Sequence, residues 1–157
     1  MCRKMNKRTI FIFFVSITIL SCFNQKPEKM QKIDASQVAR DVKSVSDSLT
    51  RYSEEAQLDL FLNGYDHSPC FSHFSSEGKM RNYQELKEIC TEYYTVLKEQ
   101  KVSTLMEKID VIDENLAVVG WTGNIIAQLK NGDSIIMNNY AITNLFKKTD
   151  GKWKIIH

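Results

Sequence analysis

The spacing of apolar residues changes near the middle of the chain, from a helical period to an alternating one. Between residues 36 and 52 an apolar side chain recurs every three or four positions, which predicts an amphipathic helix with one buried face. The residues on that face are Val38, Val42, Val45, Leu49 and Tyr52. Asp34 or Ser36 would cap the first turn, because both side chains accept hydrogen bonds from free backbone N–H groups.

Two further helices are predicted before the alternating region. Residues 54–62 form a short helix, either continuous with the first or bent near Ser53, and Asn63-Gly64 ends it where a left-handed residue is most easily accommodated. Residues 70–76 alternate aromatic and small side chains and predict a short strand. A third helix follows its candidate cap, Asn82. Its apolar face consists of Leu86, Ile89, Cys90, Tyr93 and Leu97.

After Gln100 the alternation predicts four strands, over residues 102–112, 116–129, 134–148 and 152–157. The pairs Asn131-Gly132 and Asp150-Gly151 readily adopt the positive φ of a tight hairpin, so we expect an antiparallel meander. Within the second strand, apolar residues from Ala117 to Leu129 share one face, and polar residues lie on the other. Helices followed by a hairpin-connected sheet predict an α+β domain, with the helices covering one face of a curved antiparallel sheet.

The amino terminus has the residue order of an export signal. Its first eight residues carry four basic side chains, no acid precedes Glu28, and an uncharged apolar run extends from Thr9 to Leu20. A membrane-spanning helix needs about 20 apolar residues, so this run is too short for a permanent span. The segment therefore predicts a signal peptide over residues 1–21.

The junction Ile19-Leu20-Ser21-Cys22 resembles the lipobox of bacterial lipoproteins. In that family the cysteine thiol receives a diacylglyceryl group, the preceding peptide bond is cut, and the new amino terminus is usually acylated too. The resemblance implies that Cys22 is lipidated and anchors the mature protein, because two or three acyl chains hold lastingly where one holds weakly. The alternative is an ordinary cleaved signal or a short uncleaved anchor, in which Cys22 has no such role.

Residues 22–33 would then be the lipidated cysteine and a flexible tether, and residues 34–157 a single domain around one core. The chain carries 21 basic and 19 acidic residues, but four basic ones lie in the signal, so the mature charge is −2. This balance gives no support for nucleic-acid binding. Phe23 follows Cys22 where an Asp would often indicate inner-membrane retention, so the expected location is the outer membrane, on its periplasmic or outward face.

Two cysteines remain once Cys2 leaves with the signal and Cys22 carries lipid. These are Cys70 and Cys90, whose separation of 20 residues permits a disulfide in an oxidising compartment. Two separately buried thiols are an equal alternative.

Three strings resemble the nuclear transport factor 2-like superfamily, which includes the SnoaL-like polyketide cyclases and the ketosteroid isomerases. The strings are Leu60–Asp66, Phe71–Lys79 and Phe146–His157, and the last is the most specific. The resemblance covers roughly residues 34–157 and implies a cone-shaped half-barrel, closed by a Trp-containing final strand, with a ligand pocket at its mouth. Related domains commonly continue a few residues beyond the equivalent of His157, so the last strand is short here or the sequence is incomplete.

Catalytic residues are hard to identify in this sequence. Enzymes of the superfamily place acids on pocket-facing strand positions, but the strands over 116–129 and 134–148 contain no Asp, Glu or His. The remaining acid or base candidates are Asp66, His67 and His73, with His157 at the far end of the chain. For Asp66 a turn residue, and for His73 a hydrogen-bonded histidine in a strand, is the stronger interpretation. His67 and His73 lack the further ligands that a metal site needs, and no phosphate loop or zinc motif is present, so we expect no metal or cofactor.

Aromatic and amide side chains are plentiful and could line an apolar cavity with a few polar points. The candidate ligand-binding residues are Tyr65, Trp121, Asn124 and Tyr140. The first functional hypothesis is a membrane-tethered domain that binds a small apolar ligand or a peptide without turnover. The second is an isomerase, dehydratase or cyclase acting on a small apolar substrate. The third is an interaction module that forms a homodimer through its sheet.

Overall fold

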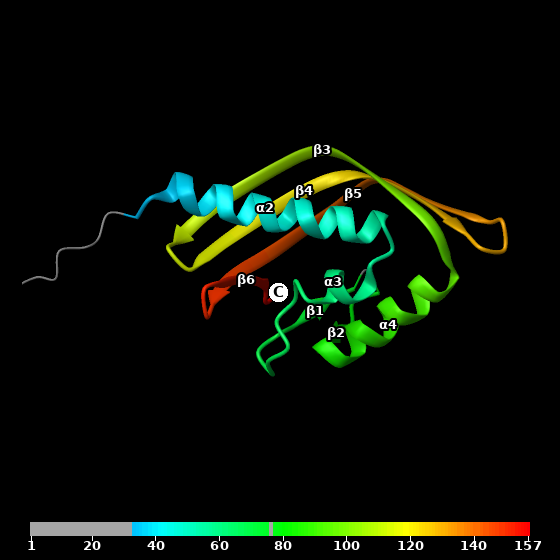
Figure 1. Ribbon diagram of the computed structural model, residues 1–157, viewed down its shortest axis with the longest axis horizontal. Coiled ribbons are helices and arrows are strands. Elements are labelled where there is room, and N and C mark those ends of the chain that lie inside the picture. Colours follow the sequence, from blue (N-terminus) through cyan, green and yellow to red (C-terminus); the bar gives the residue numbers. More distant parts are fainter. Residues whose placement is uncertain (1–32, 76) are drawn as a thin grey trace, which may run out of the picture. The chain divides into compact units, whose positions relative to one another are not determined.

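The computed structural model describes residues 33–75 and 77–157, so the predicted signal, Cys22 and most of the tether lie outside the described residues. In this part the helices are α2 (Ala35–Glu54), α3 (Leu58–Leu62) and α4 (Tyr83–Val96). The strands are β1 (His73–Phe74), β2 (Met80–Arg81), β3 (Leu97–Asp113), β4 (Leu116–Leu129), β5 (Ser134–Thr149) and β6 (Lys152–Ile155). The last four form an antiparallel meander in chain order, which confirms the predicted α+β class (Figure 1).

The first helix begins where the sequence predicts. The Asp34 carboxylate accepts a hydrogen bond from the Gln37 N–H at 3.1 Å. The helix ends at Glu54. Two residues further on, Ala56 adopts a left-handed φ of 54°, and the Gln57 N–H donates back to the Tyr52 carbonyl at 2.8 Å. This turn separates the two helices, so the second starts at Leu58 and not near residue 54. No helix in the described part of the chain is long and apolar enough to cross a membrane.

The predicted left-handed role of Gly64 is wrong, because Gly64 is not among the described residues with a positive φ. A Cβ atom at this position would lie 2.2 Å from Cδ2 of Leu49, so glycine is required for a close approach to α2. Beyond it the chain runs beside β6, where the Gly64 carbonyl accepts from the Ile155 N–H at 2.9 Å. The Asp66 N–H donates to the Ile155 carbonyl at 2.8 Å, which places Tyr65 against the last strand.

The helix α4 starts with the capping box of Asn82 and Glu85, whose side chains each accept from the other's backbone N–H. Its end differs from the prediction. Leu97, expected on the apolar face of this helix, is the first residue of β3, because the helix passes directly into the strand. The strand predicted over 70–76 is reduced to His73–Phe74, paired with β2.

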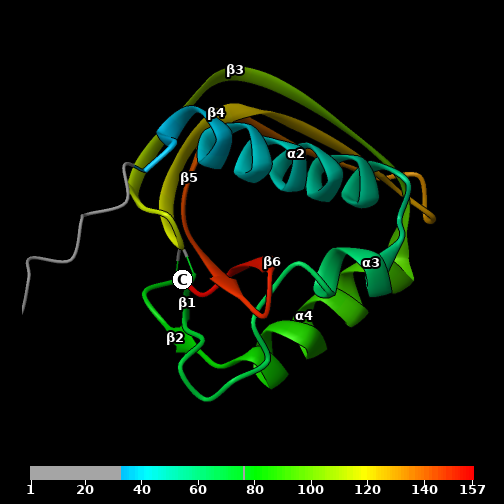
Figure 2. The ribbon, with the colours of Figure 1, turned by 60° about the vertical axis from the view of Figure 1, so that its left-hand side comes forward.

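Two bulges bend the sheet around the middle of β4. Leu105 is an extra residue on β3, between the pairs Thr104–Gly123 and Met106–Thr122. On β5, two residues face the single Asn124 of β4. Bulges of this kind bend a strand and increase its twist. The sheet therefore arches over α2 and presents a concave face to the helices (Figure 2).

The hairpin turns agree with the sequence in part. Asp150 and Gly151 both have positive φ, at 51° and 75°, as a two-residue turn requires. At Asn131-Gly132 only the glycine has a positive φ, of 95°. Here the Leu129 N–H donates to the Asp133 carbonyl at 2.8 Å and closes a three-residue loop, which needs a single left-handed residue.

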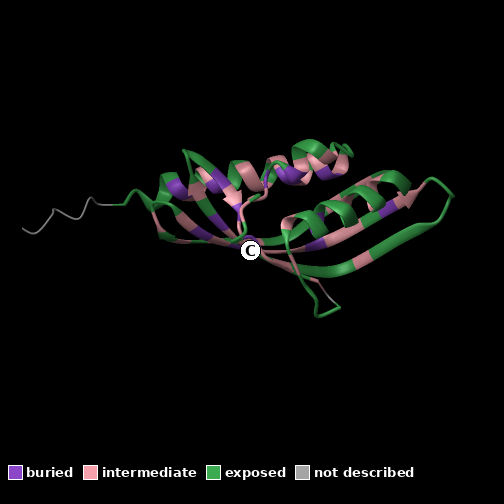
Figure 3. Ribbon diagram, turned by 90° about the horizontal axis from the view of Figure 1, so that it is seen from below, coloured by how far each residue is buried: buried purple, intermediate pink, exposed green. Residues whose placement is uncertain are grey.

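The main core lies between α2 and the part of the sheet that includes β6, where the buried positions of the two layers face each other (Figure 3). Val42 of α2 and Val119 and Phe146 of the sheet are almost fully buried. Burial of each such side chain stabilises the fold by about 1.5–3 kcal/mol. Trp153 of β6 is 7% exposed and packs in the same cluster.

Candidate functional site

A cavity of about 240 Å³ lies between the helices and the concave face of the sheet. We call it the inner cavity. All three helices and β3 to β6 contribute to its wall, and none of the described residues that line it is acidic, basic or a histidine. Those residues are Ser46, Leu49, Thr50, Ser53, Phe61, Tyr65, Cys90, Tyr93, Tyr94, Gln100, Val102, Val119, Trp121, Ile125, Ile142, Asn144, Phe146 and Ile155. A ligand with a net charge would find no counter-charge there.

A second space of about 350 Å³, the outer cavity, adjoins the first on the side of β1 and the chain end. The two share six wall residues, of which only Tyr65, Cys90 and Asn144 carry a polar group. The outer cavity adds Tyr140, His73 and His157. Two of the four predicted ligand-binding residues, Tyr65 and Trp121, thus line the inner cavity, and Tyr140 lines the outer one.

Tyr65 lies at the junction of the two cavities. Its ring packs against Phe61 and Phe71, with ring centroids 5.3 and 5.9 Å away. Burial raises the pKa of the Tyr65 phenol above its ordinary value of 10, and the nearby Cys90 and Tyr94 add to this shift. The hydroxyl therefore keeps its proton, and no hydrogen-bond partner for it is found among the described residues. It is a hydrogen-bond donor available to a ligand.

Asn144 is the second polar group at the junction, and it is not among the predicted ligand-binding residues. It alternates on β5 with Ile142 and Phe146, and all three line the inner cavity. That shared face was the sequence signal that could have identified it. The residue chosen instead, Asn124, lines neither cavity; its Oδ1 accepts from the Asn139 N–H at 3.0 Å and holds the bulge of β5.

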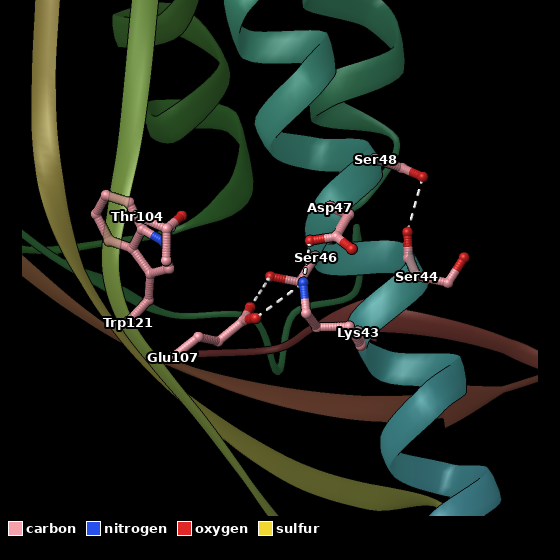
Figure 4. A network of polar contacts seen from close by, with 8 residues as sticks. All are labelled: Lys43, Ser44, Ser46, Asp47, Ser48, Thr104, Glu107 and Trp121. Atoms are coloured by element: carbon pink, nitrogen blue, oxygen red, sulfur yellow. Dashed lines mark hydrogen bonds and ion pairs between the residues drawn. The ribbon is translucent and has the colours of Figure 1, made fainter.

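The indole of Trp121 forms a fixed wall of the inner cavity. Its Nε1–H donates to the Thr104 hydroxyl of β3 at 2.9 Å (Figure 4). The ring lies over Gly123, where any Cβ atom would collide with it. Because its N–H is already bonded, Trp121 offers a ligand only the apolar surface of the ring.

A chain of hydrogen bonds covers the part of the inner cavity where α2, α4 and β3 meet. The Tyr93 hydroxyl donates to Gln100 Oε1 at 2.5 Å, and Gln100 Nε2 donates to the Ser53 hydroxyl at 3.1 Å. Ser53 in turn donates to the Thr50 carbonyl at 2.9 Å. These groups satisfy one another, so this part of the wall is held rigid and does not depend on a ligand.

One acid on the concave side, Glu107, was not predicted from the sequence, because it lies on β3 and the prediction concerned β4 and β5. Glu107 of β3 has a side chain 12% exposed and points at α2 (Figure 4). It accepts from the Ser46 hydroxyl at 2.9 Å and contacts Lys43 Nζ at 3.1 Å. The hydrogen bond to Asp47 raises the pKa of Lys43 most, burial opposes this, and the hydrogen bond to Glu107 raises the pKa further. Glu107 does not line the inner cavity itself, but Ser46 does.

The sequence-predicted catalytic candidates lie on the side of the outer cavity. His73 borders it, and burial holds the pKa of His73 below its ordinary value of 6.5, with smaller effects of Arg81 and His157. Asp66 lines neither cavity and accepts a hydrogen bond from the Ser68 hydroxyl. His67 stacks on Tyr83 with ring centroids 4.0 Å apart. Within the described residues, no three His, Cys, Asp or Glu side chains are grouped as a metal site would require.

The two cysteines that could have paired are both free thiols. Cys70 is exposed, whereas Cys90 lines both cavities. Burial raises the pKa of the Cys90 thiol to about 11. The alternative of two separate thiols therefore describes the structure, except that Cys70 is exposed and Cys90 is only half-buried.

Comparison with known proteins places residues 42–157 within a family model described as the SnoaL-like domain. No curated protein sequence gives a significant match. Among solved structures, a nuclear transport factor 2-like superfamily protein from Salmonella enterica serovar Typhimurium is similar with a TM-score of 0.68 and 18% identity, over 78% of this chain and 88% of that one.

Two other similar structures have different functional descriptions. A candidate dehydratase of the nuclear transport factor 2-like family from Streptomyces avermitilis has a TM-score of 0.65 at 13% identity, over 77% of this chain and 93% of that one. The association domain of the Caenorhabditis elegans calcium/calmodulin-dependent protein kinase II has a TM-score of 0.61 at 16% identity, over 78% and 93%. At these identities the similarity shows a shared fold alone.

Proposed function

The chain belongs to the SnoaL-like domain family and has the nuclear transport factor 2-like fold, and we propose that its domain binds a small uncharged ligand without turnover. The binding site is the inner cavity, extended at the junction into the outer one. One observation carries the proposal: an apolar cavity with no charged residue among its described walls is lined by Tyr65 and Asn144, for which no side-chain hydrogen bond is found among the described residues. Neither side chain has a fully buried unpaired polar atom, since the one such atom found in the described part of the chain is Trp153 Nε1. The polar groups of Tyr65 and Asn144 are therefore accessible, and a few such groups in an apolar pocket orient a ligand.

The proposal includes where the domain works. The lipobox at Cys22 favours export, cleavage after Ser21 and attachment by lipid to the outer membrane, on its periplasmic or outward face. The tether would allow the domain to bind its ligand near the membrane surface. This part rests on the sequence, since Cys22 lies outside the described residues.

Co-purification tests the binding proposal. Ile142 lines both cavities, so Ile142→Trp would fill the junction. Lys108→Trp places the same side chain at an exposed position of β3, outside both cavities. The protein and both variants are purified from their native host, checked for folding by thermal melting, and extracted for mass spectrometry. We expect an uncharged compound with the natural protein and with Lys108→Trp and not with Ile142→Trp; equal extracts from all three would contradict the proposal.

A catalytic role is the second candidate, and His73 is the observation that favours it. The imidazole borders the outer cavity, and its lowered pKa leaves it unprotonated at neutral pH, as a general base must be. A structural relative described as a candidate dehydratase supports an isomerase or dehydratase of this kind. Turnover of the co-purified compound, lost as pH falls below 6.5 and lost in His73→Gln, would establish it; binding without turnover would exclude it for that compound.

Self-association is the third candidate. Met106, Ile126 and Ile136 are 66%, 43% and 61% exposed on the outer face of the sheet, and Ile126 pairs directly with Ile136 in register. Similarity to a protein described as an association domain agrees with pairing of two copies through this face. Light scattering after size-exclusion chromatography would show a dimer, and Ile136→Glu would give a monomer. A monomeric natural protein would exclude this role.

A further inference from the structure

The hydrogen-bonding role of Ser46 is fixed by its neighbour. A carboxylate only accepts hydrogen bonds, so the bond of 2.9 Å between Ser46 Oγ and Glu107 Oε1 uses the single proton of the serine hydroxyl. The other carboxylate oxygen of Glu107 is 3.1 Å from Lys43 Nζ, which holds the carboxylate in place (Figure 4). Ser46 can therefore offer a ligand in the inner cavity only the lone pairs of its oxygen.

At the junction of the two cavities the protein has hydrogen-bond donors, the opposite of the acceptor at Ser46. The Tyr65 hydroxyl keeps its proton and has no partner among the described residues, so it can donate to a ligand. Asn144, which also lines both cavities, carries two further N–H donors and one acceptor. The same small cavity thus has an acceptor on α2 and a donor at the junction, with the apolar surfaces of Trp121 and Ile125 among the walls that complete it.

These two points restrict the class of ligand. We propose that the inner cavity selects an uncharged compound with an apolar body, a hydroxyl group that donates to Ser46, and a carbonyl group that accepts from Tyr65. This inference rests on the proposed binding function and deepens it. A ligand hydroxyl can donate a hydrogen bond to the Ser46 oxygen. An ether or a second carbonyl has only acceptor atoms, so it would place its oxygen against the Ser46 oxygen without a hydrogen bond. A carboxylate or an amine would be left without a counter-charge inside the cavity.

Two series of aromatic ketones, which differ in the length of the ring system, test the proposal. The probes are 4-hydroxyacetophenone and 6-hydroxy-2-acetonaphthone, each compared with the parent ketone that lacks the hydroxyl. Binding to the full chain is measured by equilibrium dialysis with the same detergent on both sides. In the series that fits, we expect the hydroxyl to tighten binding about five- to tenfold, which is the effect of one net hydrogen bond. The corresponding carboxylate, 4-acetylbenzoate or 6-acetyl-2-naphthoate, should not bind measurably.

Variants identify the two contacts separately. In Ser46→Ala the advantage of the hydroxyl compound over its parent should fall to less than about twofold. Ser48→Ala is the matched control, because this serine lies on the same helix, bonds to the Ser44 carbonyl and does not line the inner cavity (Figure 4). Tyr65→Phe should keep the hydroxyl advantage and abolish the advantage of the ketone over the matching alkyl phenol. Thermal melting of each variant confirms that it is folded.

The outcomes separate this inference from the binding function. If the parent ketones bind and Ile142→Trp blocks them, but the hydroxyl has no effect or its effect survives in Ser46→Ala, the ligand class is wrong and the cavity still binds ligands. If neither series binds the natural protein, both proposals are contradicted for aromatic ketones of this size. Preferential binding of the carboxylates would overturn the uncharged class directly.

Discussion

The indole ring of Trp121 lies directly on Gly123 two residues further along β4. A Cβ atom built at Gly123 would lie 2.3 Å from Cζ2 of Trp121 and 2.6 Å from the Ser103 carbonyl oxygen. Gly123 is buried, and β3 and β5 both bulge beside it. The glycine thus lets the indole lie flat in the bend of the sheet, where it forms one wall of the inner cavity.

Gly123→Ala should therefore displace the indole and weaken its bond to Thr104. We expect the free energy of unfolding to fall by about 1–3 kcal/mol, as for other overpacked sites, and the affinity for the cavity ligand to fall as well. Gly120→Ala is the control on the same strand, since nothing lies within 4 Å of a Cβ atom there. Urea unfolding of both variants measures the difference. Equal stabilities would show that Trp121 does not require the glycine.

Tyr65→Phe should weaken ligand binding without lowering the stability of the fold. The Tyr65 hydroxyl has no partner among the described residues, so its removal should leave the free energy of unfolding unchanged or raise it by up to about 1 kcal/mol. Tyr93→Phe, which removes the 2.5 Å bond to Gln100, should lower it by about 1 kcal/mol. Ligand affinity should fall in Tyr65→Phe. A clear loss of stability in that variant would show that the hydroxyl has a structural partner.

The two thiols should differ in reactivity with iodoacetamide. Cys70 is exposed, whereas burial raises the pKa of Cys90 to about 11, and the thiolate is the reactive form. We expect Cys70 to react at pH 8, and Cys90 to react slowly there and faster up to about pH 11. Bound ligand should slow Cys90 further and leave Cys70 unaffected. Absence of any free thiol in the oxidised protein would show that the two cysteines pair after all.

The same pKa shift makes stability depend on alkaline pH. Unfolded Cys90 loses its proton near its ordinary pKa of 9.0, while the folded protein retains the proton to about pH 11. Its contribution to stability is thus fully present below pH 9 and is lost as pH rises through 11. Urea unfolding between pH 8 and 11 should show a smaller decline in Cys90→Ala than in the natural protein. Cys70→Ala should decline as the natural protein does.

The proposed lipid anchor is tested by replacing the sulfur atom that would carry it, that of Cys22. In Cys22→Ala the chain should lose incorporation of labelled palmitate and leave the membrane fraction, because no thiol remains to accept the diacylglyceryl group. Cys2→Ala is the control within the predicted signal and should keep both properties. A natural protein that carries no label would contradict the lipoprotein interpretation.

The helices and the sheet could be predicted from the sequence because their patterns are local. The apolar face from Val38 to Tyr52, the Asn82 cap and the Asp150-Gly151 turn each act over a few residues, and all three are found in the structure. The period of two also continues through β4, because both bulges lie on its neighbours.

The candidate site could be predicted only in part, because it depends on contacts between distant elements. Tyr65 and Trp121 were found as aromatic residues in apolar surroundings. Alternation along the strands could have separated Asn144, which shares the face of Ile142 and Phe146, from Asn124, which lies on the face opposite Trp121. The bond between Glu107 and Ser46 joins positions 61 residues apart and could not be read from spacing.

The most direct measurement is a crystal structure of the full-length protein purified from its own host without added ligand. We predict electron density for a small uncharged molecule in the inner cavity, with an oxygen atom within hydrogen-bonding distance of the Tyr65 hydroxyl. A cavity closed by its own side chains, or one that contains only ordered water, would contradict the proposal that this domain is a ligand-binding module.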